Sequence, residues 1–243
     1  MNVCGQEIEY YCNGVLHKGY FARDSDSDDS LPGVMVIHEW WGVNEYVKSR
    51  VNMLAENGYC ALAIDMYGNG QQAENPDQAG EMMNSVLEDM ETGTARLKAG
   101  FDALISLDGV NPKQTAAIGY CFGGAMALHM ARIGMPLNAV ASFHGALGSF
   151  HRPVPGEIKA EILVCHGGDD AMVTMDDVSD FKKEMDTADV DYQVIVHAGA
   201  QHGFTSKEAT INGEKYGIPV GYNAKADAES WSAMMKLFDK CFN

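Results

Sequence analysis

The sequence is short of positive charge, of long apolar runs and of regularly spaced cysteines. It has 17 basic residues against 34 acidic ones, a formal net charge of −17. Such a charge repels phosphate backbones and anionic membranes, so we expect no nucleic-acid and no membrane partner. No stretch approaches the roughly 20 consecutive apolar residues of a membrane helix, and residues 1–20 lack the basic-then-apolar order of a signal peptide. We therefore expect a cytoplasmic protein.

The six cysteines form neither a Cys-x-x-Cys pair nor a regular array with histidine. A chain of 243 residues does not need disulfides for stability, so we expect reduced thiols. A structural zinc site would need such paired ligands. The sequence thus predicts no metal and no other cofactor, and it gives no indication of an oligomeric state.

Length and an apolar fraction of 46% suit a single domain, which we predict over residues 1–243. Residues 7–11 and 15–21 flank Asn13-Gly14 and predict an opening hairpin. The expected strands that follow are 33–37, 60–64, 115–120, 139–143, 160–165 and 192–196. The expected helices are 45–56, 82–107 with an interruption near Thr92-Gly93, 123–132, 175–187 and 224–242.

This alternation of strands and helices predicts an α/β fold, with a mostly parallel sheet covered by helices on both faces. In such sheets, ligand sites form at the carboxyl ends of the strands. The motifs that carry chemistry in this sequence all follow expected strands.

The segment Gly119-Tyr120-Cys121-Phe122-Gly123 predicts a nucleophile on a sharp strand-to-helix turn. Small residues two positions either side permit the strained backbone that such a turn requires. A helix N-terminus beside the sulfur favours the thiolate, and the N–H of Phe122 can stabilise a developing oxyanion. A cysteine is more often a small buried apolar residue, and we keep that interpretation for the other five.

A cysteine nucleophile needs a base, and in this architecture the acid and then the base follow it along the chain. Asp169 and Asp170 come soon after the expected strand 160–165, and His202 lies in a loop of small residues after the last strand. His202 would exchange the thiol proton, and a carboxylate would orient its ring. Spacing alone leaves Asp169 and Asp170 as alternatives.

The loop after the expected strand 33–37 contains Glu39, Trp40 and Trp41. A loop in this place usually supplies the second oxyanion N–H, which we assign to Trp40. Glu39 stands beside it, and a carboxylate near a thiol changes the thiol's affinity for its proton. Aromatic side chains in the loops either pack together or line a substrate pocket; the candidates are Trp40, Trp41, Tyr67, Phe204 and Tyr222.

At this point the chain resembles the dienelactone hydrolase family of α/β-hydrolases. The matching motifs are Glu-x-x-Gly-Val-Asn at 39–44, Ala-Ile-Asp-Met-Tyr at 63–67, Gly-Tyr-Cys-Phe-Gly-Gly at 119–124, Asp-x-x-Val at 170–173 and His-Gly-Phe at 202–204. Residues 222–231 are similar to the C-terminal segment of the family. The resemblance spans residues 33–238, and the cysteine turn is its most specific part.

The resemblance implies a triad of Cys121, Asp170 and His202, with Asp170 chosen because Val173 follows it by three residues. It also implies that Glu39 holds the resting thiol until substrate displaces it towards His202. Members that process dienelactone grip its carboxylate with two arginines. This chain has no arginine from 51 to 95, and Ser206 occupies the second position. The sequence therefore does not support dienelactone itself as the substrate.

Two functions are compatible with these residues. The first is hydrolysis of a small-molecule carboxylic ester or lactone through the Cys-His-Asp triad. The second is a ligand-binding or redox-sensing protein on the same scaffold, because a reactive thiolate also oxidises readily. Turnover that depends on His202 separates the first function from the second.

Overall fold

The computed structural model describes residues 2–27 and 29–242. The chain forms two compact units, Met1–Ile118 and Gly119–Asn243. The single domain expected over residues 1–243 stays a prediction, and Met1, Asp28 and Asn243 of that range lie outside the described residues.

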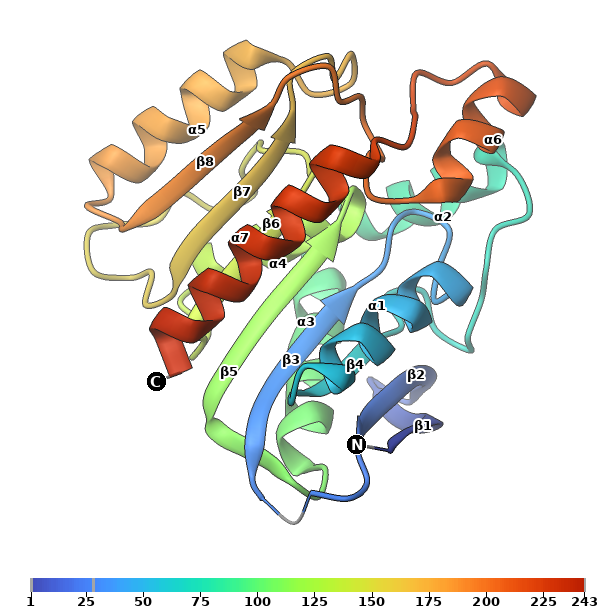
Figure 1. Cartoon of the computed structure of the whole chain (residues 1–243), viewed down its shortest axis with the longest axis vertical. Coiled ribbons are helices and arrows are strands. Elements are labelled where there is room, and N and C mark those ends of the chain that lie inside the picture. Colours follow the sequence, from blue (N-terminus) through green and yellow to red (C-terminus); the bar gives the residue numbers. More distant parts are fainter. Residues whose placement is uncertain (1, 28, 243) are drawn as a thin grey trace. The chain divides into compact units, whose positions relative to one another are not determined.

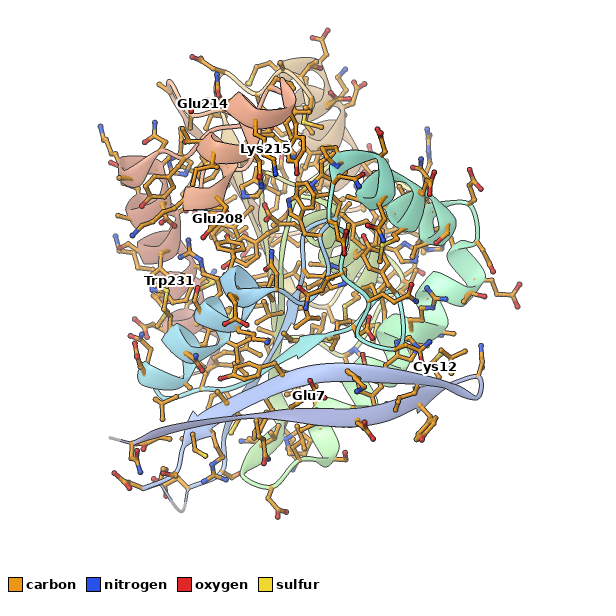
Figure 2. All side chains as sticks on the ribbon, turned by 90° about the vertical axis from the view of Figure 1, so that its right-hand side faces the viewer. Glu7, Cys12, Glu208, Glu214, Lys215 and Trp231 are labelled. Carbon is orange, nitrogen blue, oxygen red and sulfur yellow. The ribbon has the colours of Figure 1, made fainter. Side chains whose placement is uncertain are left out.

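The first unit is built on strands that run in the order β1-β2-β4-β3-β5. Strands β3 and β4 are parallel, whereas β2 pairs antiparallel with both β1 and β4. Helix α1 lies in front of these strands and α3 behind them in Figure 1, and Figure 2 shows the same two helices on opposite sides. In chain order the elements are β1 (Val3–Cys12), β2 (Val15–Asp24), β3 (Leu31–Ile37), α1 (Glu45–Glu56), β4 (Cys60–Ile64), α2 (Pro76–Leu87), α3 (Met90–Ser106) and β5 (Val110–Tyr120).

The opening hairpin is confirmed, with strands longer than expected. Asn13 and Gly14 both have positive φ angles, 50° and 79°, as a two-residue turn that matches the strand twist requires. The ladder runs from the pair Cys12 and Val15 to the pair Val3 and Asp24.

Helix α1 and strand β4 have the bounds that the sequence predicts. Asn44 caps α1 by accepting a hydrogen bond from the N–H of Val47 at 3.1 Å. The prediction of one helix over 82–107 interrupted near Thr92-Gly93 is wrong, because α2 already begins at Pro76 and the break falls at residues 88–89. Asp89 accepts from the N–H of Thr92 and so starts α3, which makes Thr92 and Gly93 part of its first turn.

The second unit contains parallel strands in the order β6-β7-β8, so their carboxyl ends meet at one edge. Helix α4 packs on β6, and α7 packs on β6 and β7. Figure 1 shows α7 in front of these strands and α4 behind. In chain order the elements are α4 (Phe122–Arg132), β6 (Ala139–Phe143), β7 (Glu161–Gly167), α5 (Met175–Thr187), β8 (Tyr192–His197), α6 (Lys207–Tyr216) and α7 (Ala224–Phe242). Within the described residues, no helix is long and apolar enough to cross a bilayer.

Helix α6 was not expected from the sequence. Ala209 is its one buried residue, so the helix lacks the repeat of apolar residues by which a helix is predicted from sequence. Its end does carry a signal, because Gly217 adopts the left-handed conformation typical of a helix C-terminus. The labelled side chains Glu208, Glu214 and Lys215 belong to this helix and are exposed (Figure 2).

Candidate active site

Cys121 occupies the turn between β5 and α4 with a φ angle of 54°, in the left-handed region. A non-glycine residue in such a conformation costs about 1–3 kcal/mol and persists only where its surroundings fix it. Here the N–H of Cys121 donates to the carbonyl of Phe143 at 3.0 Å, and its carbonyl accepts from the N–H of Gly124 at 3.0 Å. The sharp turn expected from the sequence is therefore present, with Cys121 half-buried at its apex.

Glycines on both sides of Cys121 permit this turn by close backbone approach. A Cβ atom at Gly119 would stand 1.9 Å from the carbonyl oxygen of Gly123, and one at Gly124 would stand 2.6 Å from Oγ of Ser142. The first contact is with backbone, which cannot rotate away. Gly119 is thus required for the approach of β5 to the first turn of α4.

Replacing Gly119 by alanine is expected to lower the free energy of unfolding by about 1–3 kcal/mol, because an added methyl group overlaps backbone atoms. Gly148→Ala is the matched control, since a Cβ there meets nothing within 4 Å, and its stability should lie within about 0.5–1 kcal/mol of wild type. Urea unfolding of both variants measures the difference. Equal stabilities would contradict this description of the turn.

Asp170 lies in the loop after β7 and makes hydrogen bonds with both carboxylate oxygens. Its Oδ1 accepts from the N–H groups of Met172 and Val173, at 2.8 and 3.0 Å. Its Oδ2 lies 2.8 Å from Nδ1 of His202. The neighbouring Asp169 is exposed, so the geometry distinguishes the two candidates that spacing left open.

His202 follows β8 in a loop that is held by the segment after α6. The carbonyl of His202 accepts from the N–H of Gly221, and that of Phe204 accepts from the N–H of Asn223, both at 3.0 Å. The ring of His202 is buried. Its Nε2 atom makes no hydrogen bond of standard geometry to the described residues, yet Cys121 lies near enough to raise the pKa of the ring.

The pKa values of Asp170 and His202 are shifted by their mutual interaction, and that of His202 also by Cys121. Burial alone would lower the pKa of His202, but the negative sulfur of Cys121 and the carboxylate of Asp170 raise it to about 10. Burial alone would raise the pKa of Asp170, yet His202 and the two backbone N–H groups hold it below its ordinary value. Both Cys121 and Asp170 therefore raise the pKa of His202, and Asp170 does so through its hydrogen bond to Nδ1.

We expect His202 to stay an imidazolium through neutral pH and to lose its proton near pH 10. Because its pKa is raised above the ordinary 6.5, this protonation stabilises the fold fully below about pH 6.5, and the contribution is lost as pH rises through about 10. In Cys121→Ala the midpoint should fall, since the negative sulfur is gone. Side-chain 15N NMR of His202 measures both midpoints, and identical values would contradict the contribution of Cys121 to the pKa of His202.

Two residues beside His202, namely His144 and Thr205, were not identified as site residues from the sequence. His144 follows β6, and its ring centroid lies 5.2 Å from that of His202 at an interplanar angle of 63°. Its Nε2 atom is hydrogen-bonded to Oγ1 of Thr205 at 2.7 Å. Phe204, a predicted substrate contact, is fully buried against the ring of His144, with centroids 5.1 Å apart. Its contact with substrate stays a prediction.

In the first unit, the predicted residues Glu39, Trp40 and Trp41 follow β3. Glu39 is buried, and the two tryptophan rings meet edge to face at 5.2 Å. The Tyr67 hydroxyl donates to the carbonyl of Trp40 at 2.9 Å and so fixes this loop. The roles of Glu39 in holding the thiol, of the Trp40 N–H in the oxyanion hole, and of Trp41 and Tyr67 in binding substrate stay predictions.

An arginine reaches the segment of Tyr67 from a distant part of the sequence. Nη1 of Arg96, in α3, donates to the carbonyl of Met66 at 2.8 Å. The sequence could not predict this contact of Arg96 with Met66, because it forms only when α3 packs against β4, the strand before Met66. Within the described residues, no group of His, Cys, Asp and Glu has the arrangement of a metal site.

Comparisons with known proteins agree with one another. The model of the dienelactone hydrolase family matches residues 18–242. Protein usf of Aquifex pyrophilus is 32% identical over 209 residues, with 84% of this chain and 88% of the relative covered. A protein of Aquifex aeolicus (strain VF5) named "Putative carboxymethylenebutenolidase" is 30% identical over 239 residues, with 96% and 97% covered. The crystal structure of a dienelactone hydrolase-like promiscuous phosphotriesterase, P91, from metagenomic libraries superposes with a TM-score of 0.91 at 34% identity, with both chains fully covered.

Proposed function

Because the chain belongs to the dienelactone hydrolase family and is a hydrolase, we propose that it cleaves a carboxylic ester or lactone with Cys121 as its nucleophile. The observation that carries the proposal is the hydrogen bond from His202 to Asp170, with Cys121 close enough to raise the pKa of His202. The nucleophile, the orienting carboxylate and the base follow one another along the chain in the order expected of an α/β-hydrolase. The family and its structural relatives confirm that fold.

In the first half of the proposed reaction, the sulfur of Cys121 attacks the carbonyl carbon and the carbonyl oxygen becomes an oxyanion. The C–O bond to the leaving group then breaks, and Nε2 of His202 gives its proton to the departing oxygen. The product of this half is a thioester on Cys121. In the second half, neutral His202 takes a proton from water, the hydroxide attacks the thioester, and the carboxylic acid leaves as the thiolate re-forms.

Asp170 supports both halves by holding Nδ1–H of His202, so that Nε2 is the atom that exchanges protons. The backbone N–H of Phe122, at the start of α4, is proposed to stabilise the oxyanion, together with the N–H of Trp40. Trp41, Tyr67 and Phe204 are the proposed substrate contacts.

Glu39 is proposed to hold the resting thiol, as the family resemblance implies. Removing the carboxylate would then release the thiol in the absence of substrate. Glu39→Gln should therefore be alkylated by iodoacetamide faster than wild type at pH 7, and an unchanged rate would exclude this role.

The substrate class is proposed to be a neutral ester or lactone. Arg96 already donates to a backbone carbonyl, and the two arginines that grip a substrate carboxylate in the dienelactone-processing members are absent from their expected positions. Purified protein should hydrolyse neutral aryl and alkyl esters with a higher kcat/KM than lactones that carry a carboxylate. Preference for the anionic lactones would contradict the proposal for the substrate class but not the chemistry.

The alternative of a non-hydrolytic binding or redox-sensing protein is not favoured, since the matching family is that of the dienelactone hydrolases and the P91 structure is of a dienelactone hydrolase-like phosphotriesterase. It would require oxidation of Cys121 without turnover. Ester hydrolysis that is abolished in His202→Ala would exclude it.

A further inference from the structure

Residues Phe143 and His144, at the carboxyl end of β6, are bonded to the segments that carry all three members of the triad. The carbonyl of Phe143 accepts from the N–H of Cys121 at 3.0 Å, which ties it to the nucleophile turn. The N–H of His144 donates to the carbonyl of Cys165 at 2.8 Å, on β7, the strand that leads to Asp170.

The side chain of His144 completes the third connection. Its Nε2 atom is hydrogen-bonded to Oγ1 of Thr205, three residues after His202. Its ring stands edge to face against the ring of His202, with 5.2 Å between centroids. His144 and Thr205 are both buried, so this hydrogen bond is shielded from competing water.

The backbone of His144 is itself unusual, with a φ angle of 40°. A side chain that only fills space needs neither a left-handed backbone nor an imidazole, and an apolar ring would satisfy the contact with Phe204 equally well. The imidazole adds a hydrogen bond that a phenyl ring cannot make. The presence of an imidazole at position 144 is therefore best explained by its hydrogen bond to Thr205.

A single hydrogen bond does not fix a histidine ring. The bond between Nδ1 of His202 and Asp170 locates one atom, but the ring can still tilt about that bond and turn Nε2 away from the sulfur. The ring of His144, packed against that of His202 at an interplanar angle of 63°, restricts this tilt. The bond to Thr205 in turn holds that second ring in place.

We propose that His144, hydrogen-bonded to Thr205, is a positioning residue that fixes the ring plane of His202 so that Nε2 faces Cys121. The inference rests on the proposed function, because it assigns His144 a role through the triad. His144 exchanges no proton with substrate. The titratable groups that interact with or face His202 in the described residues are Cys121, Asp170, His166 and His144.

The bond between His144 and Thr205 can be removed without touching either ring. Thr205→Val keeps the shape of the side chain and loses the hydroxyl, whereas Thr205→Ser keeps the hydroxyl and is the matched control. We expect Thr205→Val to lower kcat for ester hydrolysis by about 10- to 100-fold, the scale of a misplaced reacting group, with KM nearly unchanged. Thr205→Ser should stay within about threefold of wild type.

A role in packing alone would not move the pH dependence of the thiol, so the decisive readout is the rate of Cys121 alkylation by iodoacetamide against pH. In Thr205→Val the rise of this rate should shift to higher pH, because a tilted His202 stabilises the thiolate less. His144→Phe keeps the ring contact and should show the same shift. The double variant should show no further shift, since the two residues act through one bond.

An alkylation profile of Thr205→Val that coincides with wild type would overturn the inference, as would a shift in Thr205→Ser equal to that in Thr205→Val. Cys121→Ala, assayed beside them, separates this failure from that of the proposed function. If Cys121→Ala is inactive while Thr205→Val behaves as wild type, only the positioning role fails. If Cys121→Ala retains hydrolysis, the proposed function itself fails.

Discussion

Cys121→Ala is expected to hydrolyse small activated esters at least about 1,000-fold more slowly than wild type, because the atom that forms the thioester is gone. The remaining rate would come from binding and from the oxyanion donors. Alanine keeps the Cβ atom of cysteine, so the backbone with its φ angle of 54° gains no new strain. Steady-state kinetics with a chromogenic ester, together with a thermal unfolding curve, distinguishes lost chemistry from a lost fold.

The matched control is Cys4→Ala, which makes the same substitution at an exposed thiol on β1. Its kcat/KM should equal that of wild type within error. Turnover retained in Cys121→Ala, or lost in Cys4→Ala, would contradict the assignment of the nucleophile.

Asp170→Asn is expected to lower kcat by about 10³- to 10⁴-fold through the tautomer of His202. Oδ1 of Asp170 accepts two backbone N–H groups, so the oxygen of asparagine is held there and its NH₂ group faces His202. A donor opposite Nδ1 forces the proton of the neutral ring onto Nε2. The ring then cannot take a proton from the thiol or from water, although the shape of the site is kept.

Asp169→Asn provides the control for this effect at the adjacent position. Asp169 is exposed, and among the described residues it is Asp170 whose side chain bonds to His202. The neighbouring variant should therefore keep wild-type kcat, and comparable losses in the two variants would contradict the choice of Asp170. The pKa of His202 in Asp170→Asn should also fall, because the carboxylate that helps to raise it is removed.

Local patterns were sufficient for the elements with regular composition. The bounds of α1 and α5 could be predicted because each has a capping side chain, Asn44 or Thr174, directly before an amphipathic run. The nucleophile turn could also be predicted, since a strand-like run, small residues and a helix-forming run meet at Cys121. The break before α3 was expected at Gly93 because glycine disfavours helix. Gly93 instead lies within the first turn of α3, where it packs closely against Val86.

Long-range contacts could not be predicted from spacing. His144 and Thr205 lie 61 residues apart, and Arg96 lies 30 residues from Met66, so no local pattern connects either pair. The choice of Asp170 over Asp169 came from the family motif, and the geometry agrees with it because Asp170 alone of the two is buried. The sequence thus indicates which residues can react, while their supporting contacts depend on the fold.

Mass spectrometry of the acylated protein tests the central claim most directly. Wild-type protein mixed with excess activated ester and quenched in acid within the first turnovers should carry the mass of one acyl group on the peptide that contains Cys121. The adduct should disappear with turnover at neutral pH and be absent from Cys121→Ala. Rapid ester hydrolysis with no acyl group on Cys121, or with the acyl group on another residue, would contradict the account.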